Sequence, residues 1–144
     1  SSGYIEMNNV TADVVEIASS SGDVKLSDGK IDNFQIGTSS GYVTWKNTES
    51  EHISITAKSG EVNVSGLGEQ TNAEVSTGSG DIGISYGTQP QNLSFKISSG
   101  SDDVSVRLDD ASYTMETSAC KQGKIGDGTY SLTVNSDSGT VVIH

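Results

Sequence analysis

The sequence has 144 residues, which is enough for one domain and short for two. Its formal net charge is -11, from 19 Asp and Glu residues against 8 Lys and Arg residues; such a surface repels phosphate backbones, which excludes nucleic acid as an expected partner. The single cysteine excludes an intrachain disulfide and a metal site built on several thiolates, and no apolar run approaches the roughly 18 residues of a membrane-spanning helix.

A short phrase recurs along the chain, as SSGDVKL from Ser20, SSGYVTW from Ser39 and KSGEVNV from Lys58. The serine before each glycine returns every 19 or 20 residues. Such a period is typical of repeat proteins, in which one small unit buries its apolar face only against its neighbours. The anchor serines are Ser2, Ser21, Ser40, Ser59, Ser79, Ser99 and Ser138, with Ala119 at one imperfect position.

Pairs of apolar residues flank most anchors, and the two members of each pair are two positions apart. This period of two predicts half-buried β-strands, and helical spacing is sustained nowhere. In chain order the predicted strands contain Ile5 and Met7, Val15 and Ile17, Val24 and Leu26, Phe34 and Ile36, Val43 and Trp45, Ile53 and Ile55, Val62 and Val64, Ala73 and Val75, Ile82 and Ile84, Leu93 and Phe95, Tyr113 and Met115, Leu132 and Val134, and Val141 and Ile143.

Stacking of equivalent strands about 4.8 Å apart would line up these residues into one continuous core. The sequence therefore predicts an all-β fold, a parallel β-solenoid of about seven rungs of 19–20 residues, as a single domain over residues 1–144. Glycine at each corner would let the chain bend without a Cβ clash. The predicted corner glycines are Gly22, Gly41, Gly60, Gly80 and Gly100.

The stretch of residues 100–128 departs from the regular pattern. Its first apolar pair, Val104 and Val106, comes two residues late, which is typical of a bulge or a widened corner. At the next corner Ala119 and Cys120 replace Ser-Gly, and the following KQGKIGDGTY offers one apolar residue suited to the core. We expect distorted rungs in this stretch.

The outward positions of the predicted strands carry small polar side chains. A flat polar sheet face can bind a glycan or a protein partner, and it can equally face water. The variable turns, such as KNTESEH after Trp45, would project from one edge, and variable loops are where repeat proteins bind partners. The outward residues are Glu16, Ala18, Gln35, Gly37, Ser54, Thr56, Glu74 and Ser76 on one side and Lys25, Thr44, Asn63 and Gly83 on the other.

The position after each corner glycine mixes aromatic residues with acids, and Tyr4, Tyr42, Glu61 and Asp81 are the candidate contact residues. Tyr4 and Tyr42 would form a short exposed aromatic ridge. The acids could attract calcium, but the GGxGxD nonapeptide of calcium-binding solenoids is absent, and solvation explains the acids equally well. We expect no metal and no cofactor.

Residues suited to catalysis are few. His52 and His144 fall on different predicted rungs, and Arg107 is the only arginine. The serines recur without a neighbouring histidine, whereas a nucleophilic serine needs a base beside it. Cys120 has only Lys121 as a basic neighbour. The sequence thus predicts no catalytic residue and a protein that is not an enzyme, with a polysaccharide-active enzyme that uses Arg107 as the less favoured alternative.

The repeated phrase [ST]-S-G-[DE]-[VI]-x-[VI], with I-x-[TA]-x-S-G leading into the next turn, resembles a bacterial family of adhesin-type domains of unknown function. The similarity spans nearly the whole chain and is clearest over residues 15–97. It implies a single-stranded right-handed β-helix. It also implies an extracytoplasmic location, at the cell surface or secreted, as a segment of a longer envelope or secreted protein.

The main functional hypothesis is an adhesion-type binding domain that presents a polar sheet face and a row of turns to a protein or an envelope glycan. The rival hypothesis is a structural spacer or an end-to-end assembly module, because uncapped solenoid ends expose strand edges and favour self-association.

Overall fold

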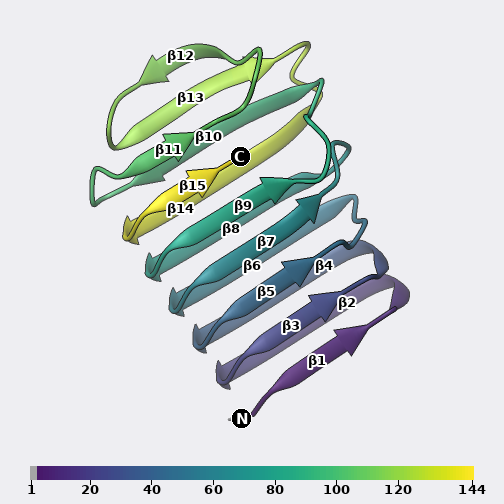
Figure 1. The fold of residues 1–144 in the computed structure, drawn as a ribbon. Coiled ribbons are helices and arrows are strands. Elements are labelled where there is room, and N and C mark those ends of the chain that lie inside the picture. Colours follow the sequence, from purple (N-terminus) through teal and green to yellow (C-terminus); the bar gives the residue numbers. More distant parts are fainter. Residues whose placement is uncertain (1–2) are drawn as a thin grey trace.

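The computed structural model describes residues 3–144, which form strands joined by turns (Figure 1). The anchor Ser2 lies outside the described residues. Within them there is no helix that is long and apolar enough to cross a membrane. In chain order the strands are β1 (Ile5–Asn8), β2 (Thr11–Ser21), β3 (Val24–Ser27), β4 (Lys30–Ser40), β5 (Val43–Lys46), β6 (His52–Ser59), β7 (Val62–Leu67), β8 (Asn72–Ser79), β9 (Ile82–Tyr86), β10 (Leu93–Ser99), β11 (Val104–Val106), β12 (Ser112–Glu116), β13 (Cys120–Ile125), β14 (Tyr130–Ser138) and β15 (Val141–Ile143).

The strands form two sheets. The eight-stranded sheet, which we name sheet A, has the order β12-β13-β10-β14-β8-β6-β4-β2, and the seven-stranded sheet B has the order β1-β3-β5-β7-β9-β15-β11. From β1 to β9 each coil gives one strand to each sheet, and equivalent strands of consecutive coils pair in parallel. In sheet A, Phe34 pairs with Ile53 and Ile53 pairs with Ala73. The prediction of an all-β, solenoid-like fold is therefore confirmed.

The core lies between the two sheets and consists of their inward side chains. Phe34 from β4 and Trp45 from β5 meet across it edge to face, with ring centroids 4.6 Å apart. The inward positions predicted from the period of two are buried over the regular coils. These buried residues are Ile17, Val24, Leu26, Phe34, Ile36, Val43, Trp45, Ile53, Ile55, Val62, Val64, Ala73, Val75, Ile82, Ile84, Leu93, Phe95, Leu132, Val134, Val141 and Ile143.

At the corners consecutive coils approach each other backbone to backbone. The φ angle of Gly60 is +138°, which L side chains rarely adopt, and an added Cβ would lie 2.0 Å from the carbonyl oxygen of Gly41. At Gly41 an added Cβ would lie 2.3 Å from the carbonyl oxygen of Gly22. Gly100 differs because its φ is not positive, yet its Cβ would meet the Asp137 carbonyl oxygen at 2.1 Å. The corner therefore excludes every side chain, even that of alanine.

Sequential stacking ends after β9, which corrects the prediction that each coil stacks on the one before it. β10 pairs in parallel with β14 and not with β8, and β11 pairs with β15 and not with β9. The last coil thus lies between two earlier coils, as the yellow strands among green ones show (Figure 1). This coil carries a regular corner, because Gly139 has a φ of +152° and stacks on Gly80 as the other corner glycines do.

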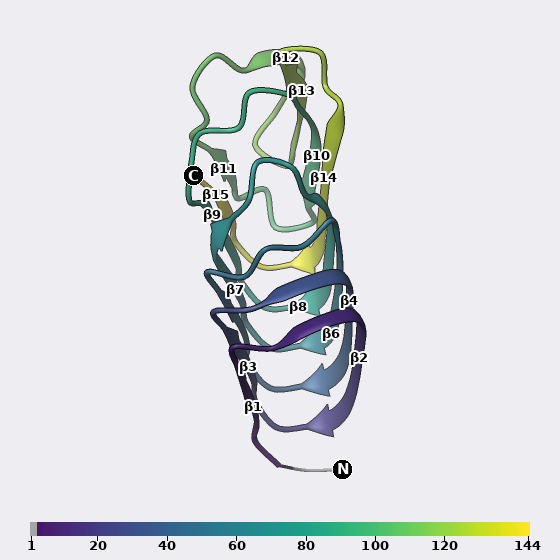
Figure 2. The ribbon, with the colours of Figure 1, turned by 90° about the vertical axis from the view of Figure 1, so that its right-hand side faces the viewer.

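The irregular stretch forms an antiparallel hairpin at the end of sheet A (Figure 2). β13 pairs antiparallel with β10, and β12 pairs antiparallel with β13. The distortion expected over residues 100–128 therefore takes the form of a reversal of the chain, not of a widened corner. A bulge between Tyr113 and Met115 turns Met115 outward, where it is 49% exposed, so its predicted inward position is wrong.

Candidate functional site

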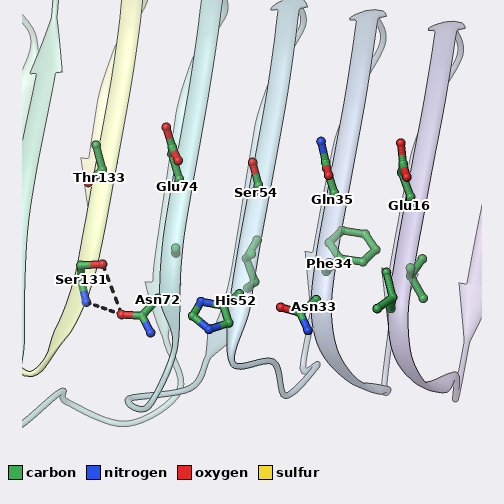
Figure 3. Close-up of a pocket in the computed structure, with 14 residues that line it drawn as sticks. Glu16, Asn33, Phe34, Gln35, His52, Ser54, Asn72, Glu74, Ser131 and Thr133 are labelled. Atoms are coloured by element: carbon green, nitrogen blue, oxygen red, sulfur yellow. Dashed lines mark hydrogen bonds between the residues drawn. The ribbon is translucent and has the colours of Figure 1, made fainter.

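A shallow groove crosses the outer face of sheet A, and we name it the sheet A groove. It runs over β2, β4, β6, β8 and β14, which are five neighbouring strands of the sheet (Figure 3). It is lined by Val14, Val15, Glu16, Asn33, Phe34, Gln35, His52, Ile53, Ser54, Asn72, Ala73, Glu74, Ser131 and Thr133.

The polar side chains of the groove stand in two rows, because parallel strands in register place equivalent residues side by side. Neighbouring strands lie about 4.8 Å apart, so each row offers a polar group at that interval. Two residues further along the strands lies a parallel row of small residues, Ala18, Gly37, Thr56 and Ser76. The polar rows are Asn33, His52, Asn72 and Ser131, and Glu16, Gln35, Ser54, Glu74 and Thr133 (Figure 3).

Most of these polar groups have no partner within the described part of the chain. Asn72 and Ser131 are the exceptions, since Oδ1 of Asn72 accepts hydrogen bonds from the backbone N of Ser131 at 3.0 Å and from the Ser131 hydroxyl at 3.2 Å. The side chains of His52, Gln35 and Glu74 make no hydrogen bond and no ion pair among residues 3–144. Their donors and acceptors are therefore available to a ligand.

Charges of both signs lie on the outer face of sheet A. Glu16 and Glu74 lie on the half of the sheet nearer the N-terminal end, as does the exposed Lys58 on β6, and Lys96 on β10 and Lys124 on β13 lie beyond β14. Thr133 pairs with Glu74 on one side and with Lys96 on the other, so opposite charges flank one hydroxyl. The hollow continues there along Ser76, Ser98 and Asn135. The face therefore offers both signs of charge between uncharged hydrogen-bonding groups.

The predicted contact residues lie apart from the groove. Tyr4 and Tyr42 are 58% and 57% exposed, and neither lines the groove. Glu61 accepts a hydrogen bond from the neighbouring Asn63 at 2.7 Å, and Oδ1 of Asp81 accepts one from a backbone N of the adjacent coil. The four residues thus stay candidates for a separate surface beside the corners, and Asp81 also has a structural partner.

Asp81→Ala is expected to lower the free energy of unfolding by about 1–2 kcal/mol, because the backbone N of Thr140, 2.8 Å from Oδ1, loses its charged acceptor. Asp81→Asn keeps an oxygen acceptor and should lose less. Urea unfolding followed by circular dichroism measures both variants. If both unfold like the wild type, Asp81 has no structural role and remains a contact candidate only.

The groups present suit hydrogen bonding to a ligand better than bond making. Among the described residues no cluster of three or more His, Cys, Asp or Glu side chains could hold a metal. His52 lies in the groove, whereas Arg107 follows β11 and its backbone N donates to Ile143. Burial raises the pKa of the Tyr86 hydroxyl well above its usual value, so this phenol stays protonated.

The outward prediction was right for the row that contains Gln35 and Glu74, and it missed the row of Asn33, His52 and Asn72. Turns were expected at the missed residues, but His52 and Asn72 begin β6 and β8, and Asn33 is the fourth residue of β4. A signal was present, since these three residues recur at the period of 19 or 20 that the anchors share. Ser131 and Thr133 stand at the same distances before their anchor Ser138, but the period does not place them beside Asn72 and Glu74, because their coil stacks out of sequence.

A family model described as Toastrack DUF4097 matches residues 1–144. The match therefore covers the hairpin and the inserted last coil as well as the regular coils. No curated protein and no solved structure matches the chain.

Proposed function

The chain belongs to the Toastrack DUF4097 family, a family of unknown function, and from this premise we propose that it is a non-enzymatic binding domain that recognises an envelope glycan through the sheet A groove. The family assigns no activity, so the surface itself has to support the proposal. The observation that carries it is the pair of polar rows, which repeat at the strand spacing over five coils with most of their groups unpaired. Such a surface can bind an extended ligand in several places at once.

A chain of sugars suits this surface better than a protein does. Amides, hydroxyls and carboxylates such as those of Asn33, Gln35 and Glu74 can donate to and accept from sugar hydroxyls. Protein interfaces are instead built around aromatic, Met or Arg anchors. Among the described residues of the groove, Val14 is the one large apolar side chain with high exposure, at 68%. A regular array of polar groups also matches a ligand whose hydroxyls repeat along its length.

A protein partner is the alternative ligand, and the exposed rings of Tyr4 and Tyr42 favour it. Tyrosine is enriched at interfaces because it buries a large rigid surface and keeps a polar end. These two rings lie near the corners and outside the groove, so binding there and binding in the groove respond to different substitutions.

We also propose a handedness and rung count for the solenoid and a cellular location for the domain. We infer that the coils wind as a single-stranded right-handed β-helix of about seven rungs. Parallel strands of one sheet that are joined by a crossover are right-handed in about 98% of cases, and sheet B has seven strands. We place the domain outside the cytoplasm, at the cell surface or secreted, where it would meet an envelope glycan.

Titration of the labelled domain with soluble neutral, acidic and amino-sugar oligosaccharides, followed by NMR, tests the proposal. The backbone signals of Asn33, His52 and Asn72 are expected to shift on binding. Ser54→Arg, which fills the middle of the groove, should weaken binding at least about tenfold, or about 1.4 kcal/mol. The matched control is Asn63→Arg, an exposed change on the opposite sheet, which should leave affinity within about twofold.

Two results would count against the groove as the binding surface. One is an equal loss of affinity in Ser54→Arg and Asn63→Arg. The other is a set of shifts confined to the corners near Tyr4 and Tyr42, which would favour the protein-binding alternative.

A further inference from the structure

The candidate contact residues beside the corners belong to one column on the outer face of sheet B. Tyr4 directly precedes β1, Asp23 precedes β3 and Tyr42 precedes β5. Because the first residue of each strand faces the core, the residue before it faces outward. The backbone N of Ile5 donates to the Asp23 oxygen at 2.9 Å, and that of Val24 donates to the Tyr42 oxygen at 2.8 Å, which keeps the coils in register. In strand order the column is Tyr4, Asp23, Tyr42, Glu61, Asp81, Thr140 and Asp103.

Two of the residues in this column are tyrosines that have no packing role. Among the described residues the exposed large apolar side chains are Tyr4, Val14, Tyr42 and Met115, so two of the four lie in this column. Neither tyrosine ring contacts another ring or a cation within residues 3–144, and neither hydroxyl has a hydrogen-bond partner there. Both rings are therefore available to a ligand from outside the chain.

The space between the two tyrosines has the width that a cation needs. Their coils are separated by the coil of Asp23, so the two Cα atoms lie two strand spacings apart, or about 10 Å. Side chains stand roughly perpendicular to a sheet, so a group held midway lies about 5 Å from each ring. Aromatic faces attract cations within about 6 Å of the ring centroid. A further coil before β1 would lie on the far side of Tyr4 and would leave this space unchanged.

The residue between the rings carries a negative charge that the chain does not neutralise. Oδ1 of Asp23 accepts a hydrogen bond from the backbone N of Tyr42 at 3.0 Å, which holds the carboxylate beside the Tyr42 ring. Asp23 forms no ion pair among the described residues. Lys25 follows two positions later, but its Nζ lies 3.8 Å from Oε1 of Glu6 and over neither ring. The Asp23 carboxylate is thus left for a cation from solution.

We propose that Tyr4, Asp23 and Tyr42 form a slot that binds the ammonium group of a small organic cation. The two rings present their π faces to the positive charge, and Asp23 supplies the opposite charge. The acids further along the column, Glu61 and Asp81, and the net charge of -11 raise the local concentration of cations. Because the slot is open to water, its affinity is expected to be in the millimolar range.

Titration of the labelled domain with three matched probes at constant ionic strength, followed by NMR, tests the slot. The probes are choline, ethanolamine and the neutral analogue of choline in which carbon replaces nitrogen. At least one of the two cations is expected to shift the backbone signals of Asp23 and Tyr42 in a saturable way, and the neutral analogue is not. Tighter binding of choline would identify a quaternary ammonium group as the ligand, and tighter binding of ethanolamine a primary one that donates to Asp23. If neither cation binds, or if the neutral analogue binds equally well, the proposal is wrong.

Substitutions separate the contribution of the rings from that of the charge, with circular dichroism to check folding. Tyr4→Leu combined with Tyr42→Leu should weaken binding of the tighter cation at least about fivefold, whereas Phe at both positions keeps the π faces and should stay within about twofold. Asp23→Asn keeps an acceptor for the Tyr42 N but removes the charge, so it should also weaken binding. Equal losses in the Leu and Phe variants would overturn the slot. Ser54→Arg fills the groove on the other sheet and should leave cation binding unchanged, so this proposal and the glycan proposal can fail separately.

Discussion

Ile55→Asp is expected to unfold the domain. Ile55 lies in β6, in the middle of the regular part of sheet A, and is 1% exposed. The substitution removes an apolar side chain whose burial is worth about 2–3 kcal/mol, and it adds a carboxylate that has no partner inside the core. A domain of this size has a total stability of about 5–15 kcal/mol, so the combined loss consumes most of it.

The matched control is Ser54→Asp, one residue earlier on the same strand. Ser54 faces outward into the groove, so the new carboxylate stays in water. Asp at this position would stand beside Glu74 on the next strand, and like charges opposite each other cost about 1 kcal/mol or less. Circular dichroism and urea unfolding compare the two variants. Equal losses of stability would contradict the assignment of inward and outward residues on which the fold and the groove both depend.

The regular coils could be predicted because parallel stacking in register turns a sequence period into a spatial one. Phe34, Ile53 and Ala73 stand next to one another in sheet A for the same reason that they recur every 19 or 20 residues. The same logic predicted Gln35 and Glu74 on the outer face. The repeat period alone is enough to place these residues, because each coil meets the same environment as the coil before it.

The position of the last coil could not be predicted in this way. Leu132 and Val134 form the same local pattern as Leu93 and Phe95, so the pattern defines two coils that could each stack on β8. The structure places Leu132 beside Ala73 and leaves the Leu93 coil one layer further out. Which of the two coils stacks on β8 depends on how its corner fits the corner at Gly80. That fit can be seen only in the three-dimensional structure. Gly139 adopts the positive φ that continues the column of Gly80, and the φ of the competing Gly100 is not positive.

A second column of backbone positions repeats along the sequence. Asn9, Asp28, Asn47 and Gly66 recur every 19 residues at the turn opposite the glycine corners. All four have φ between +47° and +71°, a region that Asn, Asp and Gly tolerate best. The period alone would therefore have placed the ends of β1, β3 and β5, whereas Gly66 lies within β7. It would also have shown that the groove residue Asn33 follows the turn instead of belonging to it.

Gly60→Ala is expected to destabilise the domain by at least about 2–4 kcal/mol, and the mechanism is local. The alanine would have to adopt a φ of +138°, and its Cβ would lie 2.0 Å from the Gly41 carbonyl oxygen, which is a backbone atom and cannot rotate away. The two coils would have to separate at the corner. That separation would strain the backbone hydrogen bond from the N of Val43 to the carbonyl oxygen of Glu61, which is 2.9 Å long and joins these two coils.

Gly37→Ala is the matched control, since it makes the same chemical change in the neighbouring strand β4. An added Cβ at Gly37 has no atom within 4 Å, and its φ lies outside the region that strains alanine. Replacement of glycine inside a strand by alanine reduces the conformational entropy of the unfolded chain, so a gain of about 0.5–1 kcal/mol is expected. Thermal and urea unfolding of the two variants should thus change in opposite directions. A Gly60→Ala protein as stable as Gly37→Ala would mean that the coils do not pack backbone to backbone at the corner. The stacking of equivalent residues of successive coils would then lack its physical cause.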